Sequence, residues 1–376
     1  MTATPTAPAA SGVSTDLLYS DVEDSLRDSL RSLLDDRCPP ESVTARYDGA
    51  APDPALWRAV ARELGLAGLL VPEELGGAGA TAREAAVVLE ELGRYVAPVP
   101  FLTSAVLATT ALLEAGEDRL LPRLAAGEAT AVLAVPLSWA PGDVRPSVRR
   151  GDDGRLRGRV SSVADADVAD ALLVPVDTSG GVELHRVPRD AAGVSVDPVV
   201  SLDMSRPLSD VALDAVEADF VTGDGAACVQ AALLTGAALL ASEQLGVAEW
   251  CLQSTVAYVR ERKQFGRPVG SFQALKHRLA DVWLEVGSAR AAARYTAGAV
   301  ADRTGDLAVG ALLAQAYCAG VAVHAAEECV QLHGGIGMTW EHPAHLFLKR
   351  AKADAIALGT AERHRALLGE LVDLRV

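Results

Sequence analysis

The feature that most constrains the fold is a change in the spacing of apolar residues at both ends of a central segment. From about Asp16 to Glu128, and again from about Asp224 to the end, apolar residues recur at helical spacing. Between about Ala129 and Phe220 the chain instead carries short valine-rich runs separated by Gly, Asp and Pro, which is typical of strands. The sequence therefore predicts a mainly α protein with a central β-domain.

The same changes in apolar spacing predict that the chain is divided into four segments. We expect a disordered lead-in at 1–15, an N-terminal helical domain at 16–128, a middle antiparallel sheet or barrel at 129–220, and a C-terminal four-helix domain at 224–376. The lead-in lacks the basic start and apolar core of a signal peptide. Within the first helical domain, the Gly-Gly of LVPEELGGAG predicts a break before a helix at Thr81–Leu92.

Composition excludes several classes of function. The net charge of −16 and the pI of about 4.9 disfavour binding to nucleic acid. The longest apolar run, Ala226–Ala241, is too short to span a bilayer and contains Gln230, so we expect no membrane insertion. Scattered cysteines without a CxxC pair predict reduced thiols in a cytoplasmic protein, with no zinc site. The five are Cys38, Cys228, Cys251, Cys318 and Cys329.

Two stretches of the C-terminal third are the most specific part of the sequence. They run from Tyr258 to Asp281 (YVRERKQFGRPVGSFQALKHRLAD) and from Cys329 to Asp354 (CVQLHGGIGMTWEHPAHLFLKRAKAD). Both resemble the signature stretches of acyl-CoA dehydrogenases, as does the order of the domains along nearly the whole chain. The resemblance implies FAD as cofactor, an acyl-CoA thioester as substrate and an electron-transferring flavoprotein as electron acceptor.

The first stretch contains residues suited to a dinucleotide. A guanidinium can bind a pyrophosphate through two charge-assisted hydrogen bonds. In the family, the Arg that matches Arg262 does so for an FAD held largely by a neighbouring subunit, and the Gln that matches Gln273 contacts that cofactor as well. Phe265 is interpreted either as an apolar surface for the cofactor or as a core residue.

The second stretch matches the family segment under the adenosine end of FAD. The matching residues are Gln331, Leu332, His333, Gly334 and Gly335. Glycines lack a Cβ, so the backbone can approach a ligand closely. The resemblance also implies that Thr360 and Glu362 lie near the cofactor and that Gly359 contacts substrate.

The sequence departs from the family where the catalytic base is expected. Proton removal from the substrate α-carbon needs a carboxylate within reach. In the commonest branch it is the Glu of a Glu-Gly-Thr turn, and here Leu358 holds that position, although its backbone amide remains. A second branch carries the base near the position of Gly236, and no acid lies between Asp224 and Glu243. No catalytic residue is therefore assigned.

Three hypotheses remain open. In the first, this chain is the base-less subunit of a heteromeric α2β2 acyl-CoA dehydrogenase that acts on a bulky acyl-CoA, such as a sterol side chain. In the second, it is a self-sufficient, homo-oligomeric flavoenzyme with another base or with monooxygenase chemistry. In the third, it is a non-catalytic stabilising or regulatory subunit.

Overall fold

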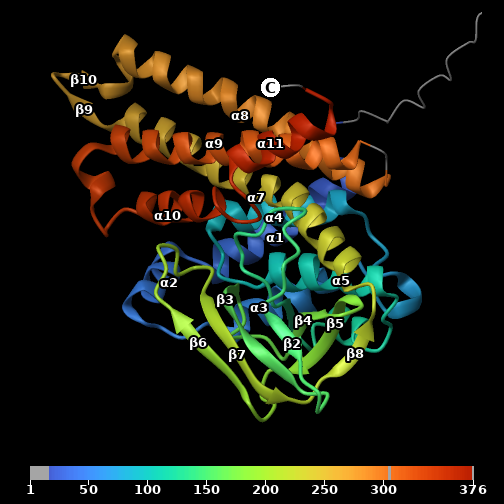
Figure 1. The fold of residues 1–376 in the computed structure, drawn as a ribbon. Coiled ribbons are helices and arrows are strands. Elements are labelled where there is room, and N and C mark those ends of the chain that lie inside the picture. The colour runs from blue at the N-terminus through green and yellow to red at the C-terminus, as the bar shows by residue number, and fades with distance from the viewer. Residues whose placement is uncertain (1–16, 304–305, 375–376) are drawn as a thin grey trace, which may run out of the picture.

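The computed structural model describes residues 17–303 and 306–374, so the predicted lead-in at 1–15 lies outside the described residues. Helices form both ends of the described chain and strands form its middle (Figure 1). The predicted fold class, mainly α with a central β-domain and helices at the C-terminus, is confirmed. The N-terminal helices and the sheet lie together beneath the long C-terminal helices (Figure 1).

Three of the N-terminal α-helices in the described chain begin at a capping side chain, which is Ser20, Asp53 or Thr81. The α-helices are α1 (Asp21–Arg37), α2 (Pro40–Thr44), α3 (Pro54–Arg58), α4 (Ala82–Tyr95), α5 (Thr109–Ala115) and α6 (Leu121–Ala125). Helix α4 covers the helix predicted at Thr81–Leu92. Its N-cap Thr81 forms a capping box with Glu84, which satisfies backbone N–H groups that the helix itself leaves unpaired.

The central strands form one mixed sheet. They are β1 (Ala131–Leu133), β2 (Val148–Arg150), β3 (Leu156–Ala164), β4 (Ala171–Thr178), β5 (Gly181–Pro188), β6 (Val194–Val199), β7 (Leu208–Val216) and β8 (Asp219–Thr222). Their order is β6-β7-β3-β2-β4-β5-β8, and β1 also pairs with β4. Because β1 and β2 both run parallel to β4, the expectation of an antiparallel sheet or barrel needs correction.

The C-terminal helices are α7 (Gly225–Glu261), α8 (Gln273–Ala301), α9 (Leu307–His333), α10 (Ala344–Asp354) and α11 (Ala361–Leu371). Helix α7 crosses α4 with backbone-to-backbone contact. A Cβ at Gly246 of α7 would lie 1.9 Å from the Glu90 carbonyl oxygen, and one at Gly93 of α4 would lie 2.2 Å from the Glu243 carbonyl oxygen. Only glycine fits at these two positions, so the close crossing is encoded in the sequence.

Two C-terminal segments, Gly225–Glu261 and Leu307–Met338, are long and apolar enough to cross a bilayer. Of their most apolar windows, however, 67% and 56% are buried inside the fold. Their apolarity is accounted for by packing, because α7 and α9 are the central helices of the bundle (Figure 1).

Candidate functional site

The two signature stretches meet at one end of the bundle. Helix α7 ends at Glu261 and α9 ends at His333. The rings of Tyr258 and His333 stack with their centroids 4.4 Å apart, and this contact joins the two helix ends. The structure thus brings Arg262, just after α7, to the same end of the bundle as Gly334, just after α9.

A short hairpin projects from this end of the bundle. Strands β9 (Lys263–Gln264) and β10 (Arg267–Pro268) form it (Figure 1). Its tip residue, Phe265, is 91% exposed and has a φ of 53°, a backbone conformation that is unfavourable for a side chain with a Cβ. The core reading of Phe265 is therefore wrong, and the ring is held out into solvent.

The polar residues of the hairpin region are also available to a ligand. Arg262 is exposed, and none of the ion pairs among residues 17–303 and 306–374 involves it. The Gln273 amide lies 3.0 Å from the His277 ring, one helical turn on. An exposed guanidinium and an exposed ring in the same hairpin region suit an anionic ligand with an aromatic part.

At the end of α9, the groups accessible to a ligand are mainly backbone groups of Gly334 and Gly335. Gly334 has a φ of 65°, and a Cβ on either Gly334 or Gly335 would meet open space. Gln331 is exposed and Leu332 is half-buried. The His333 ring is 2% exposed and its Nδ1 lies 2.7 Å from the Cys329 carbonyl oxygen, so this ring faces the core.

The segment that follows β1 packs against the turn between α10 and α11 and covers it. The Leu358 amide, which the family resemblance assigns to a substrate carbonyl, donates instead to the Leu137 carbonyl oxygen at 2.7 Å. A Cβ on Gly359 would lie 2.6 Å from the Ala140 Cβ, so this glycine is covered as well. Thr360 caps α11 by accepting a hydrogen bond from the Arg363 amide, and the exposed Glu362 follows it.

The structure thus separates the sequence-predicted residues into two groups within one chain. Thr360 and Glu362 lie at the start of α11, whereas Arg262 and Gln273 flank the hairpin at the far end of the bundle (Figure 1). A single copy does not bring the two groups together.

The two positions that could hold a catalytic base touch each other. A Cβ on Gly236 would lie 3.0 Å from Leu358 Cδ1 and 2.3 Å from Leu107 Cδ2. The cavity beside them measures about 10 Å³. It is lined by Thr103, Leu107, Leu133, Val135, Leu137, Ala164 and Leu358. This space is about that of one water molecule, so neither a flavin ring nor an acyl chain fits.

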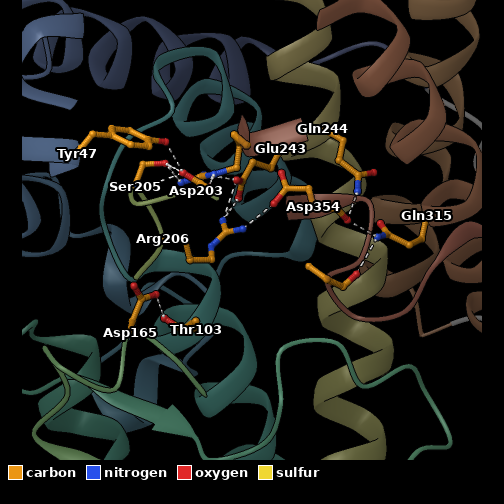
Figure 2. Close-up of polar contacts among 12 residues, drawn as sticks. Tyr47, Thr103, Asp165, Asp203, Ser205, Arg206, Glu243, Gln244, Gln315 and Asp354 are labelled. Carbon is orange, nitrogen blue, oxygen red and sulfur yellow. Dashed lines mark hydrogen bonds and ion pairs between the residues drawn. The ribbon is translucent and has the colours of Figure 1, made fainter. Parts of the chain in front are cut away.

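A buried charge cluster lies next to this cavity and engages Glu243. It consists of Asp203, Arg206, Glu243 and Asp354, which Figure 2 labels, together with the buried Arg350. Arg206 donates to Glu243 at 2.6 Å and to Asp354 at 2.7 Å, and Arg350 donates to Asp203 and Glu243, both at 2.5 Å. Burial opposes ionisation of Glu243, but the two guanidinium groups outweigh it and lower the pKa of this carboxyl. Glu243 is therefore an ion-pair partner and is not free to act as a base.

Asp354 differs from the other carboxyls of the cluster. Burial, followed by the negative charge of Glu243, raises the pKa of Asp354 to about 8. With Asp354 protonated near neutral pH, two guanidinium groups balance two carboxylates. The side-chain amides of Gln244 and Gln315 both donate to the Asp354 carbonyl oxygen, at 3.2 and 3.3 Å, and so fix the start of the turn that carries Leu358 (Figure 2).

Sequence reasoning missed one titratable residue near the cavity. Asp165 is buried and accepts a hydrogen bond of 2.6 Å from Thr103, whose side chain lines the cavity (Figure 2). Burial raises the pKa of Asp165 to about 6. The available signal was an aspartate placed directly after the segment Leu156–Ala164, which forms β3.

Comparisons with known proteins agree with the fold and with the motifs. Residues 20–128 match the family model described as acyl-CoA dehydrogenase, N-terminal domain, and residues 223–372 match acyl-CoA dehydrogenase, C-terminal domain. Acyl-CoA dehydrogenase IpdE2 of Mycolicibacterium smegmatis is 36% identical over 342 residues, which is 90% of this chain and 95% of the relative.

Two solved structures share the fold over nearly the full length. The ChsE4–ChsE5 complex from Mycobacterium tuberculosis aligns with a TM-score of 0.84 and 28% identity, covering 96% of this chain and 100% of the matched chain. A variant of the Tcur3481–Tcur3483 steroid acyl-CoA dehydrogenase aligns with a TM-score of 0.83 and 31% identity, covering 94% of this chain and 98% of the matched chain.

Proposed function

The chain belongs to the acyl-CoA dehydrogenase family, whose enzymes use FAD, and we propose that it is the base-less subunit of a heteromeric member. In this proposal an unlike partner subunit supplies the carboxylate and binds the acyl-CoA thioester. The present chain supplies cofactor contacts from its hairpin and from the end of α9. The two chains together perform α,β-dehydrogenation in an α2β2 assembly.

The observation that carries the proposal is the contact between Gly236 and Leu358. Both places where the family carries its base are apolar here, and together with Leu107 they leave a cavity of about 10 Å³. The Leu358 amide, which would otherwise polarise the thioester carbonyl, already donates to Leu137. Neither family base position thus carries a carboxylate, the oxyanion donor is already engaged, and the cavity is too small for a substrate.

The hairpin supports a role at the partner's site. FAD supplies the acceptor for the substrate β-hydride when it is bound. Arg262 would bind the cofactor pyrophosphate, and Phe265, already held in solvent, would cover an apolar part of the cofactor. The open backbone at Gly334 and Gly335 would lie under its adenosine end. None of these contacts requires this chain's closed pocket.

The substrate class is proposed from the relatives. One solved relative is a complex of two different chains, and the other is described as a steroid acyl-CoA dehydrogenase formed by a pair. We therefore propose a bulky acyl-CoA, such as a sterol side-chain ester, as substrate. We propose an electron-transferring flavoprotein as the acceptor of the electrons.

The experiment is expression of this chain alone and together with an unlike acyl-CoA dehydrogenase chain of the same organism. The proposal expects flavin and dehydrogenase activity only in the co-purified complex. Full activity of this chain as a homo-oligomer, or of the other chain by itself, would contradict it.

A second candidate, a self-sufficient flavoenzyme, has one observation in its favour. The Asp165 carboxyl has a pKa of about 6, raised by burial, and it bonds to Thr103 at the cavity wall. A pKa near the working pH suits a general base. Substrate-dependent flavin reduction by the isolated chain that is lost in Asp165→Asn would support this candidate over the heteromeric one.

A further inference from the structure

A second cavity, of about 280 Å³, lies where the N-terminal helical region meets the sheet. Its described walls contain no residue of the two signature stretches and no position that the family resemblance assigns to cofactor or substrate. Its apolar walls are Trp57 of α3, Val168 and five prolines, which are Pro52, Pro54, Pro98, Pro100 and Pro207. The cavity is therefore a separate feature of the fold, and its size suits a small metabolite.

The apolar walls of this cavity are constrained in position. A proline ring fixes its own backbone φ and removes the N–H donor, so the five prolines form stiff walls without backbone donors. The indole Nε1 of Trp57 donates to Thr130 Oγ1 at 3.1 Å, and this hydrogen bond holds the ring. The shape of the cavity is therefore largely preformed. Its charged groups are the side chains of Arg46, Asp53, Asp165 and Asp167.

Arg46 brings an unpaired donor to the cavity. The residue is 8% exposed, and its Nη1 donates to the Ala50 carbonyl oxygen at 2.7 Å. Its Nε is buried and has no hydrogen-bond partner among residues 17–303 and 306–374, and Arg46 takes part in none of the ion pairs of those residues. A buried donor without an acceptor is costly. The guanidinium therefore presents a site for a negatively charged oxygen.

Two aspartates that follow β3 bring unpaired acceptors to the same cavity. Asp165 is 4% exposed, and its Oδ2 accepts the hydrogen bond from Thr103. The Oδ1 atom of the half-buried Asp167 is buried and has no partner in the described part of the chain. Neither carboxylate is in an ion pair there, and Asp53 adds a third acidic side chain against the single guanidinium of Arg46. This side of the cavity therefore suits a positively charged donor.

We propose that this cavity binds a small zwitterion, namely an α-amino acid with an apolar side chain. The ligand carboxylate would accept a hydrogen bond from Arg46 Nε, and its ammonium group would donate to Asp165 and Asp167. Its side chain would pack on Trp57 and the proline rings. A simple cation would leave Arg46 without an acceptor, and a simple anion would meet the aspartates. The inference does not depend on the proposed function.

The test is isothermal titration calorimetry of the full-length chain with apolar L-amino acids, among them L-leucine, L-valine and L-proline. The matched ligands are L-leucinamide, which lacks the carboxylate, and 4-methylpentanoate, which lacks the ammonium group. The proposal expects saturable binding of at least one of the amino acids at one site per chain. For leucine it expects both matched ligands to bind more weakly by roughly tenfold or more, because each loses a charge-assisted contact.

Two variants locate the binding. Asp167→Asn removes a charge from the cavity wall at a half-buried residue without a hydrogen-bond partner, so the protein should fold and bind the amino acid roughly tenfold more weakly. Asp190→Asn, at an exposed aspartate of the same domain outside the cavity, should leave the affinity unchanged.

Three results would overturn the proposal. The first is that no apolar L-amino acid binds at millimolar concentration. The second is that L-leucinamide or 4-methylpentanoate binds as tightly as L-leucine, which would make the cavity a site for a simple cation or a simple anion. The third is equal affinity of the Asp167→Asn and Asp190→Asn variants, which would place the binding elsewhere. If Asp167→Asn fails to fold, the comparison of the three leucine-like ligands on the wild-type protein decides the question.

Discussion

A Cβ on Gly236 would lie 3.0 Å from Cδ1 of Leu358, although the two residues are far apart in the sequence. The family resemblance places the catalytic carboxylate of one branch at the position of Leu358 and that of a second branch near the position of Gly236. Here both positions face one apolar space that is filled mainly by Leu107 and Leu358. The loss of the base and the loss of the substrate cavity are therefore one structural feature, and both can be tested by substitution.

Gly236→Ala tests how tightly this space is filled. The new methyl would meet Leu107 Cδ2 at 2.3 Å, and overpacking of a core costs about 1–3 kcal/mol. Alanine by itself favours a helix over glycine by about 1 kcal/mol. We expect a net decrease in the free energy of unfolding, measured by urea titration. The matched control is Gly287→Ala on α8, where a Cβ meets nothing within 4 Å and stability should rise. An equal gain for both variants would contradict the packing described.

Leu358→Glu places a carboxylate at the family position of the base. In this structure the side chain enters an apolar space without a partner, so we expect destabilisation on the order of 3 kcal/mol and no dehydrogenase activity of the isolated chain. Thermal unfolding and anaerobic flavin reduction with acyl-CoA esters measure the two effects. Leu358→Met, which nearly conserves volume, is the control and should cost less than about 1.5 kcal/mol. Flavin reduction by the glutamate variant would show that the pocket opens to substrate.

Arg262→Ala should weaken retention of FAD by the complex with the partner subunit. Loss of a charge-assisted hydrogen-bonded pair costs about 1.5–3 kcal/mol, which corresponds to a tenfold or greater decrease in affinity. Flavin content after dialysis provides the measurement. Arg260→Ala removes an exposed arginine from the same helix end and should leave the flavin content unchanged. Equal retention in the Arg262 and Arg260 variants would remove Arg262 from the cofactor site.

Asp354→Asn should change how stability depends on pH. The folded-state pKa of about 8 lies above that of the unfolded chain, so ionisation of Asp354 favours unfolding increasingly as pH rises from about 4 to about 8. Asparagine removes this contribution and can still accept the hydrogen bond from Arg206. The lowered pKa values of Asp203 and Glu243 act in the opposite direction, but they are present in both proteins.

Unfolding temperatures at about pH 5 and about pH 8 test this prediction. The gain of the Asp354→Asn variant over wild type should be larger at the higher pH. Asp118→Asn, at an exposed site, serves as the control and should show the same difference from wild type at both values. A pH-independent effect of Asp354→Asn would mean that Asp354 is ionised in the folded protein.

The sequence predicts local features better than contacts between distant segments. Thr81 and Glu84 indicate the start of α4 from the sequence alone, because capping is a local interaction. The absence of a base follows directly from reading Leu358 in its motif. No local pattern reveals that the Leu358 amide is engaged by Leu137, because this contact joins segments more than 200 residues apart.

The interior charges were hidden for the same reason. No motif in the sequence singles out Asp203, Arg206 and Arg350, and only the fold brings them together with Glu243. The parallel pairing of β1 and β2 with β4 depends on how the chain returns across the sheet, which alternation of apolar and polar residues does not encode. The assignment of cofactor-contacting residues stays a prediction.

The central claim is that this chain contributes residues to a flavin site but does not form a complete flavin site by itself. Flavin stoichiometry tests this claim most directly. The visible spectrum and total protein are measured for the chain alone and for the complex co-purified with its unlike partner, before and after anaerobic addition of acyl-CoA. We predict a colourless chain alone, and a complex that holds one FAD for each unlike pair and is bleached by substrate. One FAD per chain in a homo-oligomer that acyl-CoA bleaches would contradict the account.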